Sequence, residues 1–156
     1  MNGWRRVLLA GGLGVALAAA ACSSKSPASP TAVSPTGSSG NSVGATVSDF
    51  AIALSSSSGT AGSVTFTITN KGPSEHEFVV LQTDLAADQL PITTESGAQV
   101  ASEEASDITN IGEAEDIQSG STTTLTLELP AGTYVMICNL PAHYGLGMRA
   151  AFTVGG

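Results

Sequence analysis

From Ala45 onward, apolar and polar residues alternate in short runs that are separated by glycine, proline and serine. In the clearest run, residues 62–70, Val64, Phe66 and Ile68 fall on one face and threonines on the other. Because successive side chains of a strand point to opposite faces, this alternation predicts a strand with one buried face. Further strand-like segments are residues 46–54, with a slip in phase near Asp49, and residues 76–81, 122–129, 133–138 and 148–154. No long helical period occurs in this part of the sequence, so we predict an all-β sandwich or barrel.

The composition fits a single globular domain with additional terminal segments. The chain has 156 residues, of which 42% are hydrophobic, and a hydrophobic core can form at this length. Its net charge of −8 argues against nucleic acid as a partner, because phosphate binding requires clustered lysine and arginine. With two cysteines, the chain cannot be a disulfide-dense scaffold.

Residues 1–21 have the features of a secretory signal peptide. Arg5 and Arg6 precede an uncharged stretch of 15 residues, which is short for a membrane span. Small residues lead into Cys22, and this pattern resembles the lipidation motif of bacterial lipoproteins, although Ala19 stands where that motif usually has leucine. We therefore expect Cys22 to be lipidated, and ordinary cleavage that leaves Cys22 as a tail thiol is the alternative. The arginine pair leaves both Sec and twin-arginine export open.

Residues 22–44 are expected to form a flexible tether between the lipid anchor and the folded domain. Serine, proline and glycine dominate this segment, and Lys25 is its only charged residue. Such a segment buries too little apolar surface to offset the entropy of ordering it. We therefore expect a membrane-anchored lipoprotein that faces the periplasm or the cell exterior, with residues 45–156 as its folded domain.

A long acidic segment interrupts the strand pattern at residues 82–116. It contains nine acidic residues and no lysine or arginine. Residues 84–90 are compatible with a short helix before Pro91, residues 108–111 with a brief strand, and the rest with a long exposed excursion. A solvated acidic surface is the simpler interpretation, and a partner-binding site is the alternative.

The residues best suited to bind a metal converge on the last predicted turn. Cys138, His143 and Met148 follow the spacing C-x4-H-x4-M between the last two predicted strands, and His76 begins an earlier strand. A thiolate, two imidazoles and a weak thioether are the ligand set of a blue-copper electron-transfer site. Each residue alone has an ordinary explanation, as a surface histidine, a small buried cysteine or a core-filling methionine. Their joint occurrence favours one copper site, whereas Met136 is expected to fill the core.

Two segments of the sequence resemble the cupredoxins, the type 1 blue-copper proteins. They are residues 70–80, NKGPSEHEFVV, and residues 138–148, CNLPAHYGLGM. In that family one histidine lies upstream on a strand, and a cysteine, a histidine and a methionine lie in the loop between the last two strands. The spacing within the loop is similar to that of azurin, auracyanin, rusticyanin and sulfocyanin. The resemblance covers the whole folded part and implies a Greek-key β-sandwich, one copper ion per chain and single-electron transfer.

The sequence departs from the family beside two of the expected ligands. Ala142 precedes His143 where many relatives have glycine, and we expect it to stiffen the approach to His143. Glu77 follows His76 where plastocyanin-like members often have asparagine. The family implies a hydrogen bond from the backbone N–H of this neighbour to the cysteine sulfur, which Glu77 can supply, and we expect the Glu77 carboxylate to face outward.

These observations predict a type 1 blue-copper protein that carries single electrons between redox partners at the outside of a membrane. The edge of His143 would meet the partner through an apolar rim, and the acidic segment would steer a basic partner such as a basic cytochrome c. We expect a monomer and no enzymatic activity, because Met148 would fill the position that a catalytic zinc site leaves open. Copper binding and delivery without electron transfer is the alternative function. The rim would consist of Leu140, Pro141, Ala142, Leu146 and the neighbouring glycines.

Overall fold

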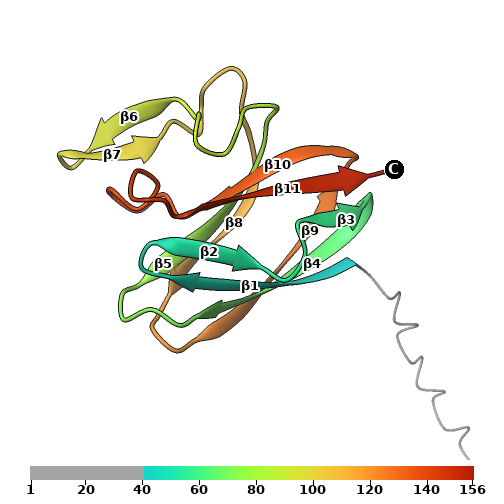
Figure 1. Cartoon of the computed structure of the whole chain (residues 1–156), viewed down its shortest axis with the longest axis horizontal. Helices are drawn as coiled ribbons and strands as arrows, with labels where there is room; N and C mark the ends of the chain where they lie inside the picture. The colour runs from blue at the N-terminus through green and yellow to red at the C-terminus, as the bar shows by residue number, and fades with distance from the viewer. Residues whose placement is uncertain (1–40) are drawn as a thin grey trace, which may run out of the picture. The chain divides into compact units, whose positions relative to one another are not determined.

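The computed structural model describes residues 41–156, which form strands and no helix (Figure 1). The predicted signal peptide, the lipidation site Cys22 and the predicted tether up to residue 40 lie outside the described residues. Residues 41–44 were assigned to the tether, but they belong to the first strand, because they pair with β4 and bury Val43. The strands are β1 (Asn41–Ser48), β2 (Ala51–Leu54), β3 (Ser58–Thr60), β4 (Gly62–Asn70), β5 (His76–Gln82), β6 (Ile92–Glu95), β7 (Ala98–Ala101), β8 (Thr109–Ile117), β9 (Thr122–Leu129), β10 (Gly132–Ile137) and β11 (Arg149–Gly155).

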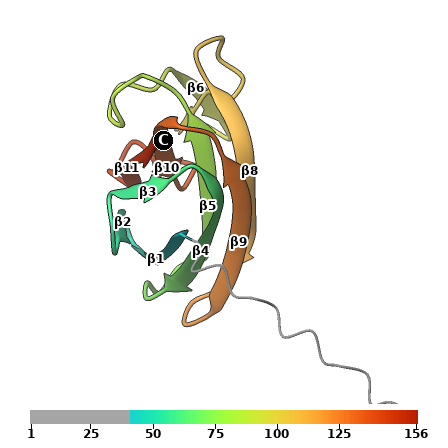
Figure 2. The same cartoon turned by 90° about the vertical axis from the view of Figure 1, so that its right-hand side faces the viewer.

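Two mixed sheets pack face to face, as Figures 1 and 2 show. One sheet has the strand order β2-β1-β4-β9, and the other has the order β3-β11-β10-β5-β8. The connections from β4 to β5 and from β8 to β9 pass from one sheet to the other. This arrangement confirms the all-β Greek-key sandwich that the resemblance implied. Within residues 41–156, no helix has the length and apolar character needed to cross a membrane.

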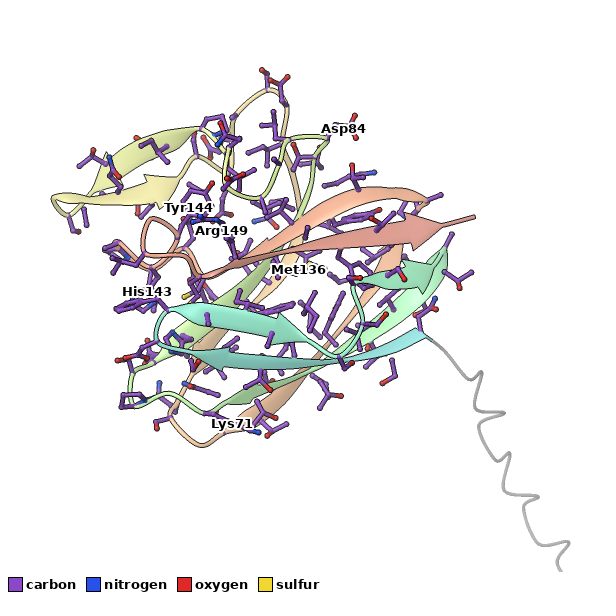
Figure 3. All side chains as sticks on the ribbon, in the orientation of Figure 1. Lys71, Asp84, Met136, His143, Tyr144 and Arg149 are labelled. Atoms are coloured by element: carbon purple, nitrogen blue, oxygen red, sulfur yellow. The ribbon has the colours of Figure 1, made fainter. Side chains whose placement is uncertain are left out.

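The core lies between the two sheets and is built from the alternating apolar faces that the sequence predicted. In β4, Phe66 and its apolar neighbours on the same face are fully buried. The centroid of the Phe66 ring lies 5.4 Å from that of Phe78 on β5 and 5.7 Å from that of Phe152 on β11. One aromatic cluster therefore joins the two sheets. Met136 is buried in the same core, which confirms its expected role (Figure 3).

Residues 46–54 form two strands, and the prediction of one interrupted strand was wrong. β1 ends at Ser48, Asp49 and Phe50 make the turn, and β2 returns antiparallel to β1. The slip in phase near Asp49 marks this hairpin. As a consequence Phe50 is 40% exposed, whereas Val47, Ile52 and Leu54 turn towards the core.

The segment between β5 and β8 carries the β6–β7 hairpin, and the helix predicted for residues 84–90 is not formed. One turn is closed there, by a hydrogen bond from the Gln89 N–H to the Ala86 carbonyl (2.8 Å). Tyr144 engages the neighbouring backbone groups, because its hydroxyl accepts from the Leu90 N–H (3.0 Å) and donates to the Ala87 carbonyl (3.0 Å). A tertiary contact therefore overrides the local helical pattern. The strand predicted at residues 108–111 is longer than expected, since β8 continues to the buried Ile117.

Replacing Phe66 by alanine should lower the free energy of unfolding by about 3–5 kcal/mol, because the removed ring leaves a cavity that its neighbours fill only in part. Urea denaturation of the protein measures this change. Thr124→Ala on the outer face of β9 is the control and should change the free energy by less than about 1 kcal/mol. Equal losses in the two variants would contradict the central position of Phe66.

Candidate metal centre

Three of the four residues predicted to bind metal have their donor atoms together at one end of the sandwich. His76 is the first residue of β5, Cys138 follows β10 directly, and His143 lies in the loop between β10 and β11. The metal-binding atoms of these three side chains all lie within 4.8 Å of one another. The Cys138 sulfur is 3.9 Å from Nδ1 of His76 and 3.3 Å from Nδ1 of His143. Both histidines therefore turn the same ring nitrogen towards the sulfur.

Met148, the fourth predicted residue, is fully buried at the end of the same loop. Its backbone carbonyl accepts a hydrogen bond from the Cys138 N–H (3.1 Å), and its own N–H donates to the His143 carbonyl (3.0 Å). These two bonds bring Met148 beside the other two loop residues, and its side chain belongs to the same buried cluster as Cys138. The four residues named from the sequence thus occupy one region of the structure.

The loop before His76 is organised by Asn70, to which sequence analysis assigned no role. Asn70 ends β4 and is fully buried, and its amide donates to the carbonyls of Ser74 (2.7 Å) and Ile117 (2.8 Å). Its side-chain oxygen accepts from the Gly72 N–H (2.8 Å). These bonds fold the loop back, so that β5 begins at His76 with a completely buried imidazole.

The β10–β11 loop is held in a similar way by Asn139. The Asn139 amide pairs with the backbone of Ala101 in β7, donating to its carbonyl (2.9 Å) and accepting from its N–H (2.6 Å). It also donates to the Glu103 carboxylate (2.7 Å). In the same loop, the Ala142 N–H donates to the Gln99 carbonyl (3.0 Å). Part of the acidic segment therefore supports the loop that carries the metal-binding residues.

Tyr144 ties the opposite side of this loop to the segment after β5. Its ring is buried, and its hydroxyl makes the two hydrogen bonds to the backbone of Ala87 and Leu90. Arg149 donates to the Tyr144 carbonyl (2.9 Å), and its guanidinium carbon lies 5.4 Å from the centroid of the tyrosine ring (Figure 3). Sequence analysis assigned no role to Asn139 or Tyr144, the two residues that anchor this loop. The only available signal was their position, because Asn139 follows Cys138 and Tyr144 follows His143.

The backbone of Glu77 makes the expected contact, but its side chain does not point where the sequence analysis predicted. Its N–H donates to the Cys138 sulfur (3.4 Å), as the resemblance implied. Its carboxylate does not face outward but is half-buried and accepts a hydrogen bond from the Asn139 N–H (2.6 Å). Burial raises the pKa of Glu77 to about 7, and the neighbouring Glu103 carboxylate adds to the rise. Glu77 therefore links the two backbone segments that carry His76 and Cys138.

Ala142 adopts a φ of 73°, in the left-handed region where a side chain costs about 1–2 kcal/mol relative to glycine. Glycine would adopt this backbone conformation without that cost. That alanine stiffens the approach to His143 stays a prediction, based on the narrower range of backbone conformations open to alanine than to glycine.

The turn between β1 and β2 contacts both imidazoles. Oδ1 of Asp49 lies 2.9 Å from Nε2 of His76, and the ring of Phe50 meets the His143 ring edge-on with the centroids 5.3 Å apart. Figure 1 shows this turn and the β10–β11 loop at the same end of the sandwich. These contacts were not predicted, because the hairpin itself was not recognised in the sequence.

The protonation preferences of the donor groups suit a metal that binds thiolate and neutral imidazole. Burial raises the pKa of Cys138 to about 11, so the thiol keeps its proton until a metal ion replaces it. Burial lowers the pKa of His143, and the neighbouring His76 adds to the effect, which favours the neutral ring. A thiolate, two imidazoles and a nearby thioether fit copper, whereas magnesium, calcium and manganese prefer oxygen ligands.

Comparison with known protein families agrees with this donor set. Residues 43–155 match the copper binding proteins of the plastocyanin/azurin family. The chain therefore belongs to this family of cupredoxins, and copper is the metal of the site. A comparison with curated proteins gives no significant sequence match.

Solved structures of cupredoxins share the fold. Auracyanin from the photosynthetic bacterium Roseiflexus castenholzii is 21% identical, with a TM-score of 0.52 over 74% of this chain and 98% of its own. Auracyanin B is also 21% identical, with a TM-score of 0.52 over 74% of this chain and 89% of its own. Rusticyanin from Thiobacillus ferrooxidans is 17% identical, with a TM-score of 0.50 over 74% of this chain and 78% of its own. At these identities the likeness supports the fold.

Replacing Asn70 by alanine should lower the free energy of unfolding by at least about 2 kcal/mol, because three backbone groups lose their hydrogen-bond partner. Copper affinity should fall as well, since the loop before His76 loosens. Denaturant unfolding and a competition titration with a copper chelator measure the two effects.

Asn110→Ala is the matched control, because the Asn110 amide is exposed on β8 and bonds to the side chains of half-buried Glu103 and exposed Glu113 rather than to backbone groups. It should change the free energy of unfolding by less than about 0.5 kcal/mol and leave copper affinity unchanged. An Asn70→Ala protein as stable and as copper-avid as this control would refute the role given to Asn70.

Proposed function

We propose that this protein is a type 1 copper electron carrier with His76, Cys138, His143 and Met148 as the metal ligands. The observation that carries the proposal is the convergence of one thiol and two imidazole Nδ1 atoms within 4.8 Å, at one end of the sandwich. Copper bound to such donors exchanges one electron between Cu(I) and Cu(II). Membership in the plastocyanin/azurin family supports the same function.

The residues around the donors limit how far the site can rearrange. His76, Cys138 and Met148 are fully buried, which keeps bulk water from these three side chains. The Glu77 N–H donates to the sulfur, and a hydrogen bond to a metal-bound sulfur tunes the reduction potential. Because the donors are held by backbone hydrogen bonds, a change of charge at the metal should move them little, and a small rearrangement favours fast electron transfer.

Electrons would enter and leave through His143. Among the three donors that converge, His143 alone is partly exposed. The exposed apolar side chains Phe50 and Leu146 lie at this end, with 40% and 59% of their surface accessible. A shallow cavity of about 280 Å³ lies beside Leu146 and is lined by Ala98, Gln99, Ala142, Gly145 and Leu146. An apolar rim of this kind supports close docking of a second redox protein, with Phe50 as a rim residue that sequence analysis missed.

The surface charge supports a basic redox partner. Every acidic residue of the segment 82–116 is exposed except Glu103, which is half-buried. Within residues 41–156, Lys71 and Arg149 are the only lysine and arginine. A positively charged partner such as a basic cytochrome c would therefore be attracted and oriented before it docks.

The proposed location is the outer face of a membrane. The signal peptide of residues 1–21, lipidation at Cys22 and the Ser/Pro/Gly-rich tether support export and anchoring. There the protein would act as a monomer without enzymatic activity, since the fourth donor, Met148, leaves no coordination position for a substrate.

Adding Cu(II) to the metal-free protein should produce an intense absorption band towards the red end of the visible spectrum. The band arises from thiolate bound to Cu(II), so Cys138→Ser should abolish it, whereas Cys22→Ser should retain it in full. Absorption spectroscopy of the three proteins makes the test. Weak absorption by the unaltered protein, or slow electron self-exchange in spite of an intense band, would favour copper delivery as the function.

Electron transfer to a basic cytochrome c should slow as ionic strength rises. Increasing the salt from about 0.01 M to about 1 M shortens the range of the acidic field, and the second-order rate constant should fall at least tenfold. Stopped-flow kinetics over this range measures the effect.

Two charge variants test whether the carboxylates near the metal centre cause the salt dependence. Glu113→Gln with Glu115→Gln should reduce the salt dependence, because these carboxylates lie close enough to influence the pKa of Glu77 beside the centre. Glu128→Gln should leave the salt dependence nearly unchanged, because Glu128 pairs with Ser63 at the start of β4, far from the end of β4 that leads to the site. A rate constant that is independent of salt would eliminate electrostatic steering.

A further inference from the structure

Both ring nitrogens of His76 are engaged, and their partners differ in kind. Nδ1 faces the Cys138 sulfur at 3.9 Å, on the side where the metal donors converge. Nε2 faces Oδ1 of Asp49 at 2.9 Å. A carboxylate oxygen can only accept a hydrogen bond, so the proton of the neutral ring belongs on Nε2 and the lone pair of Nδ1 is left for the metal.

Asp49 is itself held in place. Its second oxygen accepts a hydrogen bond from the Ser74 hydroxyl (2.8 Å), in the loop that leads into His76. One oxygen of Asp49 is therefore held by Ser74 while the other faces Nε2 of His76. The carboxylate is therefore a fixed negative charge on the outer side of a buried imidazole.

Gly72 closes the backbone over the contact between Asp49 and His76. A Cβ atom at Gly72 would come within 2.7 Å of Oδ1 of Asp49 and within 3.0 Å of Nε2 of His76. The backbone of this glycine is anchored by Asn70, to which its N–H donates, and by Ser119, which donates to its carbonyl (2.7 Å). A side chain at position 72 would therefore collide with the hydrogen bond between Asp49 and His76. The imidazole is completely buried, and a quarter of the Asp49 side chain is exposed.

The two imidazoles of the site thus have different neighbours on the side away from the Cys138 sulfur. Within residues 41–156, His76 makes the single histidine–carboxylate contact at ion-pair distance. His143 instead meets the Phe50 ring. A carboxylate behind a metal-bound histidine fixes the tautomer and raises the basicity of the ligand.

We propose that Asp49 is a positioning residue of the copper centre, which holds His76 as the Nε2–H tautomer and favours Cu(II) over Cu(I). The inference rests on the proposed function, because it assumes that His76 is a copper ligand. A negative charge behind His76 stabilises the more highly charged metal ion, so Asp49 lowers the reduction potential of the centre. Removing it should raise that potential.

The test compares Asp49→Ala, Asp49→Asn and the control Glu128→Gln with the unaltered full-length protein. The asparagine is isosteric and can still accept from Nε2, so it removes the charge while retaining the hydrogen bond. Glu128→Gln removes one charge at the opposite end of the sandwich, with no contact to the site. Circular dichroism verifies that each variant is folded.

Two readouts separate positioning from a purely structural role of the turn. The first is the tautomer of His76 in the metal-free protein, measured by long-range ¹⁵N–¹H NMR at alkaline pH. Unaltered protein should show the proton on Nε2, and Asp49→Ala should lose this preference. The second is the reduction potential. Loss of a residue behind a metal-bound histidine typically weakens metal binding by about 10–100-fold. A tenfold loss that falls on Cu(II) alone raises a one-electron potential by about 59 mV.

The expected result is a tenfold or greater shift of the Cu(II)/Cu(I) affinity ratio towards Cu(I) in Asp49→Ala, a smaller shift in the same direction in Asp49→Asn, and none in Glu128→Gln. An intense blue band in all proteins, with the tautomer and potential of Asp49→Ala equal to those of Glu128→Gln, would overturn the inference and leave the proposed function intact. Absence of the blue band in the unaltered protein would overturn both.

Discussion

Hydrogen bonds between backbone segments far apart in the sequence hold the donor atoms of the metal centre together. His76 and Cys138 are 62 residues apart, yet the antiparallel pairing of β5 with β10 brings the strand that begins with one beside the strand that precedes the other. Glu77 completes the link, because its N–H reaches the Cys138 sulfur and its carboxylate reaches the Asn139 N–H. The position of the cysteine relative to the first histidine is therefore a property of the sheet. A metal ion that binds here meets donors that are already arranged.

The acidic segment has a structural task in addition to its charge. The backbone of its β7 strand forms hydrogen bonds with the Asn139 side chain, and the Glu103 carboxylate accepts a hydrogen bond from the same amide. The Tyr144 hydroxyl donates to the backbone of the residues before β6. The two interpretations drawn from the sequence, a solvated surface and a partner-binding site, both overlooked this support. Since the same segment is rich in carboxylates, the field that would attract a partner originates from the element that steadies the loop around His143. The same segment therefore supplies negative charge near His143 and supports the loop that carries His143.

Local patterns in the sequence predicted most strands of the two sheets and the candidate donors, but not the β1–β2 turn, the β6–β7 hairpin or the contacts that hold the site. The one-sided alternation around Phe66 predicts its strand because burial has a period of two residues, and the spacing of Cys138, His143 and Met148 is chemistry confined to one loop. The Asp49–Phe50 turn escaped notice because it contains neither glycine nor proline. The helix expected at residues 84–90 failed because Tyr144, distant in sequence, bonds to the backbone there. Asn70 and Asn139 act on the backbone of remote residues, which leaves no periodic signal in the chain.

The central claim is that one sulfur and two imidazole nitrogens, held by the fold, bind a single copper ion in both of its oxidation states. X-ray absorption spectroscopy at the copper edge, recorded on the oxidised and on the reduced protein, tests this claim most directly. The account predicts one short copper–sulfur and two copper–nitrogen distances in both states, with little change upon reduction. A first shell without a short sulfur distance, or one that loses a nitrogen ligand when the copper is reduced, would contradict it.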